Sequence, residues 1–302
     1  MDKGIISKKI IADLLHTNEE NISNLCVVKK GLTNKSYTFQ YNYMPYIIRI
    51  PGVGSNKLIN REQEFEVYQC IKSRDICDEL VYINANTGYK VTKFYPDART
   101  CNPYIVNDVK RCIEFLRNLH SQKLYVDHIF HLFQKIDAYE KLRKNKSSIY
   151  SDYMQTKANI FSMEKYIKNN VEDITLSHID SVCDNFLFVP LSDGTEAIKL
   201  IDWEYSGMHD PHIDIAMFCV YSRYNKKQID EIIDFYFLGN VKENIRIKYI
   251  VILQLVDYFG VIGVNISIHW ELLLVLMQYS NICMQKNITI WYQTSYRYEA
   301  FV

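Results

Sequence analysis

The sequence has little of several features that mark particular classes of protein. Its 302 residues carry no net charge, because 35 basic and 35 acidic side chains cancel. No overall basic field therefore draws the chain to nucleic acid or acidic lipid, although a local basic patch is compatible with this balance. Tryptophan is scarce, with 3 residues, whereas tyrosine (24) and phenylalanine (14) are abundant. Such a ring content is typical of ring-lined pockets or of a low-GC coding bias, and composition alone favours the coding bias.

The eight cysteines lack the spacing of a metal site. No two of them form a CxxC pair, and none joins a histidine cluster, so we expect no structural zinc. The N-terminal stretch does not resemble a signal-peptide core, and scattered cysteines without such a signal predict reduced thiols in a cytoplasmic protein. The cysteines are Cys26, Cys70, Cys77, Cys101, Cys112, Cys183, Cys219 and Cys283.

Long hydrophobic runs free of polar residues are also missing. The most apolar segment, residues 249–266, has nearly the length of a membrane span but contains Gln254, Asp257 and Asn265. We expect a buried core helix there and no membrane insertion. A membrane-bound role is the alternative, and solubility without detergent would exclude it. A hydrophobic content of 48% excludes a disordered chain.

Hydrophobic periodicity divides the chain into a β-rich first part and a mainly helical second part. An N-terminal helix over residues 6–15 precedes strand-like runs up to residue 50, and further strands are expected at 80–83 and 89–94. A helix at 57–73 lies between them. The second part is predicted to contain helices at 106–121, 136–143, 150–169, 226–237 and 243–266. The outline is an α+β chain with a connector near residue 95 and one hairpin inside the helical part.

The pattern H-x-D-x-x-x-x-N at residues 178–185 carries the strongest chemical signal. A hairpin marked by Asp193-Gly194 follows, and its second strand ends at Asp202. This order fits phosphoryl transfer, in which Asp180 accepts a hydroxyl proton while Asn185 and Asp202 supply oxygen ligands to Mg²⁺. A helix cap plus two surface acids would explain any single member of the set, but not the ordered combination.

The β-rich part contains two features that suit a nucleotide. The turn Gly31–Asn34 lies between two expected strands, where its N–H groups would form an anion-binding concavity or merely close an ordinary hairpin. Arg49 stands in an otherwise apolar strand and needs an anionic partner, and a phosphate together with Glu64 of the next helix would satisfy it. Gly52-Val53-Gly54 is interpreted as a turn.

At this point the sequence resembles the bacterial, LicA-type choline kinases. These belong to the choline/ethanolamine kinase group within the aminoglycoside-phosphotransferase-like, protein-kinase-like fold. The resemblance covers about residues 5–260, and the 178–185 motif alone marks only the wider superfamily. The run at 201–206 with the following Asp-Pro-x-x-Asp is more specific to choline-type kinases. The supporting segments are Gly31–Asn34, Tyr46–Gly52, Leu58–Glu64, His178–Asn185, Ile201–Ser206 and Asp210–Asp214.

The resemblance implies a two-lobed, protein-kinase-like α+β fold. A small β-rich nucleotide-binding lobe would span residues 1–95, and a larger, mainly helical lobe with the catalytic loop and substrate site would span 96–302. Asp180 becomes the catalytic base, and Asn185 and Asp202 become the Mg²⁺ ligands. The nucleotide-binding residues implied are Gly31, Thr33, Asn34, Arg49 in place of the kinase lysine, its partner Glu64, and the adenine connector Thr92, Lys93, Phe94 and Tyr95. Asp214 would brace the catalytic loop, His178 would pack within it, and Glu204 and Tyr205 would line the alcohol side.

One feature departs from the family. Choline kinases usually place a Trp-x-x-Trp pair on a late helix, whereas the matching segment here, 253–263, contains no tryptophan. Tyr258 or Phe259 is a candidate replacement, with Trp270 and Trp291 as further candidates. Asp257 in this apolar helix is a candidate partner for the substrate cation, although a hydrogen-bonded core carboxylate is the simpler interpretation.

The sequence thus predicts an ATP- and Mg²⁺-dependent kinase that phosphorylates a small amino alcohol, choline first. Ethanolamine or another amino alcohol is the alternative within the enzyme class, because a primary ammonium would use carboxylates such as Glu204 or Asp257. Aminoglycosides usually require a broadly acidic pocket and fit less well. A non-catalytic binding protein on the same fold is a further alternative, but such proteins usually lose the base or a metal ligand.

Overall fold

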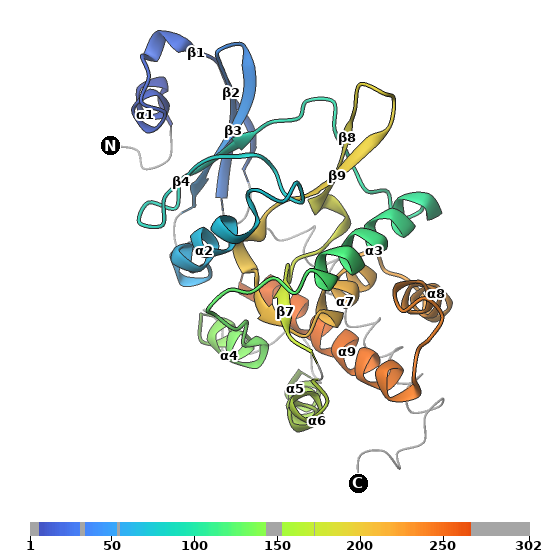
Figure 1. Ribbon diagram of the computed structural model, residues 1–302. Coiled ribbons are helices and arrows are strands. Elements are labelled where there is room, and N and C mark those ends of the chain that lie inside the picture. Colours follow the sequence, from blue (N-terminus) through green and yellow to red (C-terminus); the bar gives the residue numbers. More distant parts are fainter. Residues whose placement is uncertain (1–5, 31–33, 53–54, 143–152, 172, 267–302) are drawn as a thin grey trace. The chain divides into compact units, whose positions relative to one another are not determined.

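The computed structural model describes residues 6–30, 34–52, 55–142, 153–171 and 173–266 (Figure 1). The chain divides into two compact units, and the division is discontinuous in sequence. Unit 1 combines Met1–Cys101 with Asp184–Gly207, and unit 2 combines Asn102–Cys183 with Met208–Val302. The segment that contains Asp202 therefore belongs to the same unit as the N-terminal strands.

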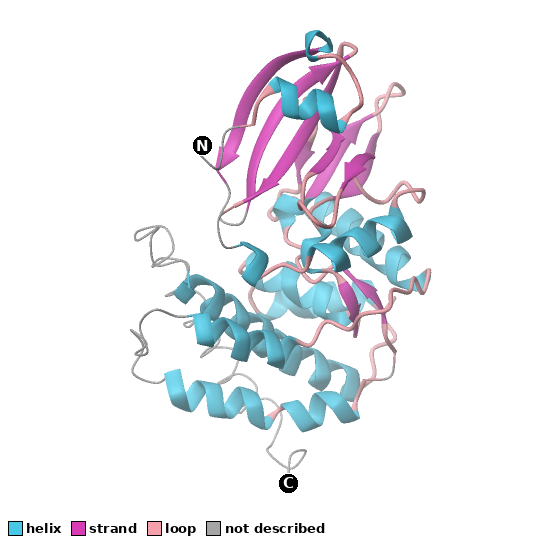
Figure 2. Cartoon of the chain, turned by 90° about the vertical axis from the view of Figure 1, so that its left-hand side faces the viewer, coloured by secondary structure: helices cyan, strands magenta, loops and turns pink. Residues whose placement is uncertain are grey.

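A five-stranded sheet forms most of unit 1, with the strand order β1-β2-β3-β5-β4 and antiparallel pairing throughout (Figure 2). Its strands are β1 (Ile22–Lys30), β2 (Asn34–Tyr41), β3 (Met44–Pro51), β4 (Leu80–Ile83) and β5 (Lys90–Lys93). The expected strands are confirmed. The register places Arg49 of β3 opposite Ser36 of β2 on one side and Lys90 of β5 on the other.

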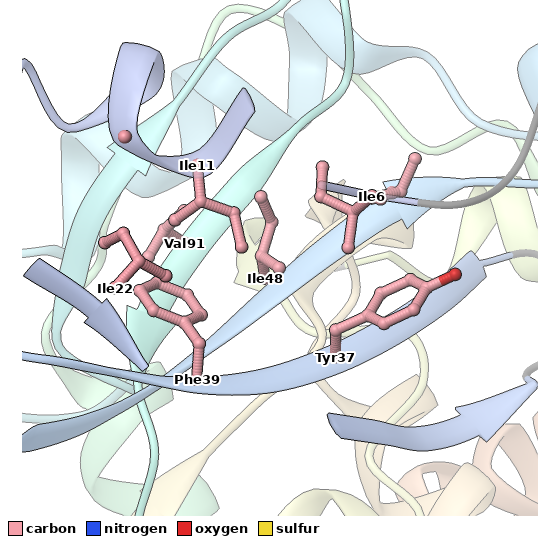
Figure 3. Close-up of a cluster of buried hydrophobic side chains, with 9 residues drawn as sticks. Ile6, Ile11, Ile22, Tyr37, Phe39, Ile48 and Val91 are labelled. Carbon is pink, nitrogen blue, oxygen red and sulfur yellow. The ribbon is translucent and has the colours of Figure 1, made fainter. Parts of the chain in front are cut away.

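The core of unit 1 lies where helix α1 (Lys8–Leu14) packs on this sheet. Ile11 of the helix joins Phe39, Ile48 and Val91, all of which are buried (Figure 3). These side chains come from alternate positions of the strands, so one face of the sheet is apolar. The other residues of the cluster are Ile6, Ala12, Ile22, Tyr37 and Ile50.

Helix α2 (Arg61–Ile71) starts later than the expected helix at 57–73. The side chain of Asn60 accepts hydrogen bonds from the backbone N–H groups of Glu62 and Gln63, which makes Asn60 the N-cap. Ser55–Lys57 forms a separate 3₁₀ turn before it. The cap matters for the site because it places Arg61 and Glu64 on the first turn of α2.

A three-stranded sheet completes unit 1, in the order β6-β8-β9. Its strands are β6 (Arg99–Thr100), β8 (Phe186–Pro190) and β9 (Glu196–Leu200). The predicted Asp-Gly hairpin is confirmed: Gly194 has a φ of +84°, and Asp193 accepts hydrogen bonds from both the N–H and the hydroxyl of Thr195. Phe186 pairs with Leu200, so the two ends of the hairpin lie side by side.

Unit 2 is mainly helical. Helix α7 packs on the long helix α9, and α3 packs against both α7 and α8 (Figure 1). The helices are α3 (Val106–Ser121), α4 (Leu132–Leu142), α5 (Tyr153–Ser162), α6 (Glu164–Asn169), α7 (His212–Tyr221), α8 (Lys226–Tyr236) and α9 (Glu243–Ile266). A small sheet pairs β7 (Thr175–Ser177) with β10 (Gly207–His209). Within the described ranges, no helix combines the length and the apolar character that crossing a membrane requires.

Further helices differ from the expectation in unit 2, where α4 begins at Leu132, before the expected start at residue 136. The expected helix at 150–169 is two helices, and the Ser162 hydroxyl at the end of α5 donates to the carbonyl of Asn159 at 2.6 Å. Such back-bonding competes with helix continuation. The sequence analysis did not predict α7, whose residues from His212 to Val220 are all buried, so it shows no amphipathic period.

Candidate active site

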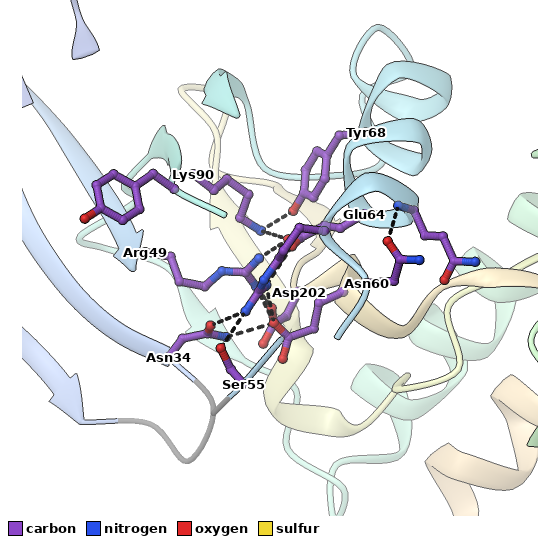
Figure 4. Close-up of polar contacts among 12 residues, drawn as sticks. Asn34, Arg49, Ser55, Asn60, Glu64, Tyr68, Lys90 and Asp202 are labelled. Carbon is purple, nitrogen blue, oxygen red and sulfur yellow. Dashed lines mark hydrogen bonds and ion pairs between the residues drawn. The ribbon is translucent and has the colours of Figure 1, made fainter. Parts of the chain in front are cut away.

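Arg49 lies at the centre of a buried charge cluster in unit 1 (Figure 4). Its guanidinium contacts the carboxylates of Glu64 and Asp202, and Nη1 is 3.1 Å from Oε2 of Glu204. Burial alone would lower the pKa of Arg49, but the negative charges of Asp202 and Glu204 outweigh it and raise the pKa. The structure therefore brings together the predicted Arg49–Glu64 pair and the predicted metal ligand Asp202.

Glu204 and Asn34 belong to the same cluster. The side-chain amide of Asn34 donates to Oε2 of Glu204 at 2.8 Å, and both side chains are buried. Glu204 was predicted to line the alcohol side, and this role stays a prediction. Tyr205, from the same 3₁₀ turn (Trp203–Tyr205), is half-buried.

Sequence reasoning missed Arg61, which faces the same carboxylates. Nη1 of Arg61 is 2.8 Å from Oε2 of Glu64 and 3.3 Å from Oε2 of Glu204, and Nη2 donates to Oδ1 of Asn34 at 3.0 Å. Burial and the positive charge of Arg49 lower the pKa of Arg61. Its place in the Arg-Glu-x-Glu run at residues 61–64 shows an acid partner nearby, but nothing in the sequence places Glu204 there.

Lys90 is a second cation that the sequence analysis missed. Its ammonium donates to the hydroxyl of Tyr68 at 2.6 Å and is 3.6 Å from Oε1 of Glu64. The Tyr68 hydroxyl in turn donates to Asp78 at 3.1 Å. Burial, followed by the charge of Arg49, lowers the pKa of Lys90 to about 8. Lys90, Val91 and Thr92 of β5 are all buried, so Lys90 is a buried charge within this strand.

The two predicted metal ligands are neighbours in unit 1. The carbonyl of Asn185 accepts the N–H of Ile201 at 2.9 Å, which places Asn185 beside the residue that precedes Asp202. Asp202 has a left-handed backbone, with a φ of +67°, and its side chain is 37% exposed. Both offer oxygen donors, which Mg²⁺ prefers.

These residues fit a magnesium ion that is shared with a phosphate. Among the described residues, no three His, Cys, Asp or Glu side chains gather as a metal-binding group. At phosphotransfer sites, Mg²⁺ combines one or two protein ligands with phosphate oxygens and water. Asp202 and Asn185 are the residues that would hold the ion.

The predicted adenine connector, Thr92–Tyr95, continues from β5. Its N–H groups at Lys93 and Phe94 donate to the carbonyls of Glu79 (2.9 Å) and Pro45 (3.0 Å). Lys93 and Phe94 are therefore held within unit 1 through their backbone donors. Thr92 is buried in the sheet, and burial raises the pKa of Tyr95 to about 12.

In unit 2, Asp214 holds the backbone of the loop at residues 178–181, which is the predicted catalytic loop. Its carboxylate accepts the backbone N–H groups of His178 at 2.8 Å and Ile179 at 2.7 Å, and its carbonyl accepts the hydroxyl of Ser181 at 2.6 Å. Burial alone would raise the pKa of Asp214, but hydrogen bonding and charge from His120 outweigh it and lower the pKa. The loop that carries Asp180 is therefore fixed on both sides of that residue.

His120 of α3 is a further residue that the sequence analysis missed. Its Nε2 lies 2.9 Å from Oδ2 of Asp214, and its Nδ1 lies 2.8 Å from the hydroxyl of Tyr236. Because a carboxylate only accepts hydrogen bonds, Nε2 of His120 donates to Asp214, and Nδ1 shares the second hydrogen bond with the Tyr236 hydroxyl. His120 thus extends the support of the loop to α3 and α8.

Asp257 and Tyr258 of α9 are fully buried in unit 2. The ring of Tyr258 lies 5.8 Å from that of Tyr153. Burial and the negative charges of Asp180 and Asp257 raise the pKa of Tyr221, at the end of α7. Asp257 is thus within electrostatic reach of the same tyrosine as the predicted base.

Several predicted residues lie outside the part of the chain that the structure describes. These are Gly31, Thr33, the Phe259 side chain, Trp270 and Trp291. Their predicted roles stay predictions.

Solved structures share the fold of this chain. Choline kinase LicA from Streptococcus pneumoniae superposes with a TM-score of 0.76 at 22% identity, covering 93% of this chain and 97% of that one. The structure of LicA in complex with AMP gives a TM-score of 0.77, also at 22% identity, and covers 93% of this chain and 98% of that one. The fold is that of kinase-like phosphotransferases, and the predicted α+β fold class is confirmed.

A profile of the choline/ethanolamine kinase family matches residues 25–234. The chain belongs to that family, whose members are phosphotransferases with an alcohol acceptor, and the resemblance found in the sequence is confirmed. Protein LicA from Haemophilus influenzae is 28% identical over 214 residues, which are 68% of this chain and 60% of that protein. The match therefore spans less than two thirds of that relative's length.

Proposed function

We propose that this protein is an ATP- and Mg²⁺-dependent kinase that transfers the γ-phosphate of ATP to the hydroxyl of choline, giving phosphocholine. The observation that carries the proposal is the buried cluster in unit 1, where Arg49 contacts both Glu64 and Asp202. In a family of phosphotransferases, the Arg49 guanidinium is a cation held beside Asp202, the carboxylate that we assign to Mg²⁺. A triphosphate requires a cationic side chain and a metal ion to neutralise its negative charge.

The residues divide the chemistry as follows. The alcohol oxygen attacks the γ-phosphorus in line, the bond from that phosphorus to the bridging oxygen breaks, and ADP leaves. Asp180 accepts the hydroxyl proton, and the two N–H bonds to Asp214 hold its loop in place. Arg49 binds phosphate oxygens, Asn34 belongs to the same cluster, and the backbone at 92–95 meets the adenine. Gly31 and Thr33 are also assigned to the nucleotide.

Asn185 and Asp202 would hold the magnesium ion. Bound there with the nucleotide, the ion supplies charge neutralisation of the phosphates. Asp202 already has one oxygen directed at Arg49, so its carboxylate is oriented by the protein.

Choline is the acceptor that the relatives favour. The run Ile201–Ser206 followed by Asp210 and Asp214 is of the choline-kinase type, and the Streptococcus pneumoniae relative is described as a choline kinase. A quaternary ammonium has no N–H group to donate, so ring faces must hold it. Tyr205 and Tyr258 are the rings we assign to it.

One observation favours ethanolamine or another primary amino alcohol as the second candidate. Asp257 is fully buried in α9, on the segment that contains no tryptophan. A carboxylate at that position suits an ammonium that donates hydrogen bonds better than one that cannot.

The test is an ATP-consumption assay with Mg²⁺ in which choline, ethanolamine and an aminoglycoside are compared. We expect turnover with choline first, and loss of at least about 100-fold in Asp180→Asn. Full activity of Asp180→Asn would refute the assigned base. Nucleotide binding without turnover on any alcohol would refute the kinase assignment and favour a binding protein.

A further inference from the structure

Two arginines and two glutamates alternate in a closed ring inside unit 1. Arg49 contacts Glu64 and lies 3.1 Å from Glu204, and Arg61 lies 2.8 Å from Glu64 and 3.3 Å from Glu204. Each carboxylate therefore faces both guanidinium groups. All four side chains are at most 9% exposed, so solvent screens these charges weakly.

The ring is balanced in charge. Two arginines and two glutamates sum to zero. Outside the ring, Asp202 adds a negative charge beside Arg49, and Lys90 adds a positive charge 3.6 Å from Glu64. Removing the charge of Arg61 would leave Glu64 and Glu204 with only Arg49 in the ring. Burying a carboxylate without its cation costs free energy. Glu64 and Glu204 would then both be attracted to Arg49.

Arg61 also connects three segments of unit 1. Its Nη2 donates to Asn34 at the start of β2 and lies 3.4 Å from the hydroxyl of Ser55. The glycine of the β4–β5 turn, Gly88, allows this placement, because a Cβ there would fall 3.0 Å from Nε of Arg61 and 2.6 Å from Cγ of Pro51. The guanidinium is thus enclosed in a fixed position.

We propose that Arg61 is a positioning residue for the nucleotide: it neutralises Glu64 and Glu204, which leaves Arg49 available to the phosphates of ATP. The proposal rests on the proposed function and adds a residue to it. Without Arg61, the excess negative charge both repels the polyphosphate and holds Arg49 away from it. Nucleotide affinity therefore depends on Arg61, whereas affinity for choline, which we assign to the rings of Tyr205 and Tyr258, does not.

Calorimetry of a non-hydrolysable ATP analogue with Mg²⁺, in the absence of alcohol, tests the proposal. We expect Arg61→Gln to bind the analogue about tenfold more weakly, the effect of losing one charge-assisted contact. Arg61→Lys, which keeps the charge, is expected to recover most of the affinity. The matched control is Arg99→Gln, because Arg99 forms a two-point ion pair with Glu196 in the same unit but outside the ring. We expect Arg99→Gln to bind like the wild type.

The double variant Arg61→Gln/Glu204→Gln separates charge balance from a merely structural role. Removing a negative charge from the Arg61→Gln background restores the balance, so the double variant should bind the analogue more tightly than Arg61→Gln alone. Additive weakening in the double variant would overturn the proposal, as would unchanged affinity in Arg61→Gln.

Steady-state kinetics give a second readout. We expect KM for ATP to rise about tenfold in Arg61→Gln while KM for choline stays unchanged. An equal rise in both would overturn the proposal. Failure of the proposed function would look different: the wild-type protein would bind the analogue yet turn over no alcohol. The calorimetric comparison of the Arg61 variants with the wild type would still test the role of Arg61 in that case.

Discussion

Asp214 holds Ile179 in a backbone conformation that a β-branched residue rarely adopts. Oδ1 of Asp214 accepts the N–H of Ile179 at 2.7 Å, and Ile179 has a φ of +71°. A left-handed conformation at isoleucine costs on the order of 1–3 kcal/mol and persists only where surrounding contacts enforce it. The strained residue immediately precedes Asp180, which links the buried carboxylate to the geometry of the proposed base.

Replacing Asp214 with asparagine should therefore damage the loop. An amide presents an NH₂ group where the carboxylate accepts from His178, Ile179 and His120, so at least one of these donors loses its acceptor. We expect Asp214→Asn to lower kcat on the order of 100-fold, because misplacement of a base by about 1 Å has effects of this size. Unfolding free energy should fall by about 1–3 kcal/mol per unsatisfied donor.

Asp108→Asn is the matched control, because the Asp108 carboxylate is also buried in unit 2 and accepts the backbone N–H of Asn102 at 3.1 Å. It should lower stability without a comparable loss of kcat. Wild-type kcat in Asp214→Asn, measured below its melting temperature, would contradict the bracing role.

Alanine substitutions at Gly88 and Gly194 separate two costs to stability, the strain of a positive φ and the steric contact of an added Cβ. Both have positive φ, +69° and +84°, but a Cβ at Gly194 meets nothing within 4 Å, whereas one at Gly88 meets Pro51 and Arg61. Gly194→Ala should cost about 1 kcal/mol, the strain alone. Gly88→Ala should cost about 1–3 kcal/mol more, because the neighbours must move. Urea denaturation measures both, and equal losses would contradict the close approach.

Stability should rise with pH where the buried Lys90 loses its proton. Its pKa is about 8 in the folded protein, against an ordinary value of 10.5. Between these values the unfolded chain binds more protons than the folded chain, so raising the pH favours folding. The stabilisation is fully developed above the unfolded pKa and is absent below the folded one.

Lys90→Met should remove this pH dependence. Urea unfolding between about pH 7.5 and pH 9.5 should show the wild type gaining on the order of 1 kcal/mol relative to the variant. Lys227→Met, at a lysine whose side chain is 87% exposed, should keep the wild-type slope. Parallel curves for Lys90→Met and the wild type would show that Lys90 is not the titrating group.

Asp257→Asn tests which alcohol accepts the phosphate. If this carboxylate binds the substrate ammonium, KM for ethanolamine should rise about tenfold and KM for choline less, because only a primary ammonium donates to it. KM for ATP should stay constant. Lower thermal stability with both alcohol KM values unchanged would make Asp257 a core carboxylate.

The sequence predicted those elements whose signal is local. Helices α3 and α9 were predicted with the bounds that they have in the structure, because their apolar spacing is regular or continuous, and the hairpin was predicted from Asp193-Gly194. Helix α7 was missed because burial on every side removes the period on which such a prediction depends. Strands β7 and β10 have three residues each, too few for alternation to be recognised.

The same limit applies to the site. Arg49 was recognised because a cation in an apolar strand needs an anion, and Glu64 lies nearby in the chain. Asn34 and Glu204 are 170 residues apart, and no local pattern reports their contact. Lys90 was missed for that reason. For Arg61, spacing along the chain indicates only Glu64, whereas its contacts with Asn34 and Glu204 depend on how the strands and the helix pack.

The discontinuity of unit 1 has a consequence for how the protein is made. Residues Met1–Cys101 leave a ribosome long before Asp184–Gly207, which unit 1 also requires. Until then Arg49 lacks its partners Asp202 and Glu204, so the cations around Glu64 outnumber the carboxylates. We therefore expect the nascent N-terminal sheet to mature only after the chain has been extended past residue 207. A fragment that ends at residue 101 should fold poorly, and supplying residues 184–207 on a short linker should restore it.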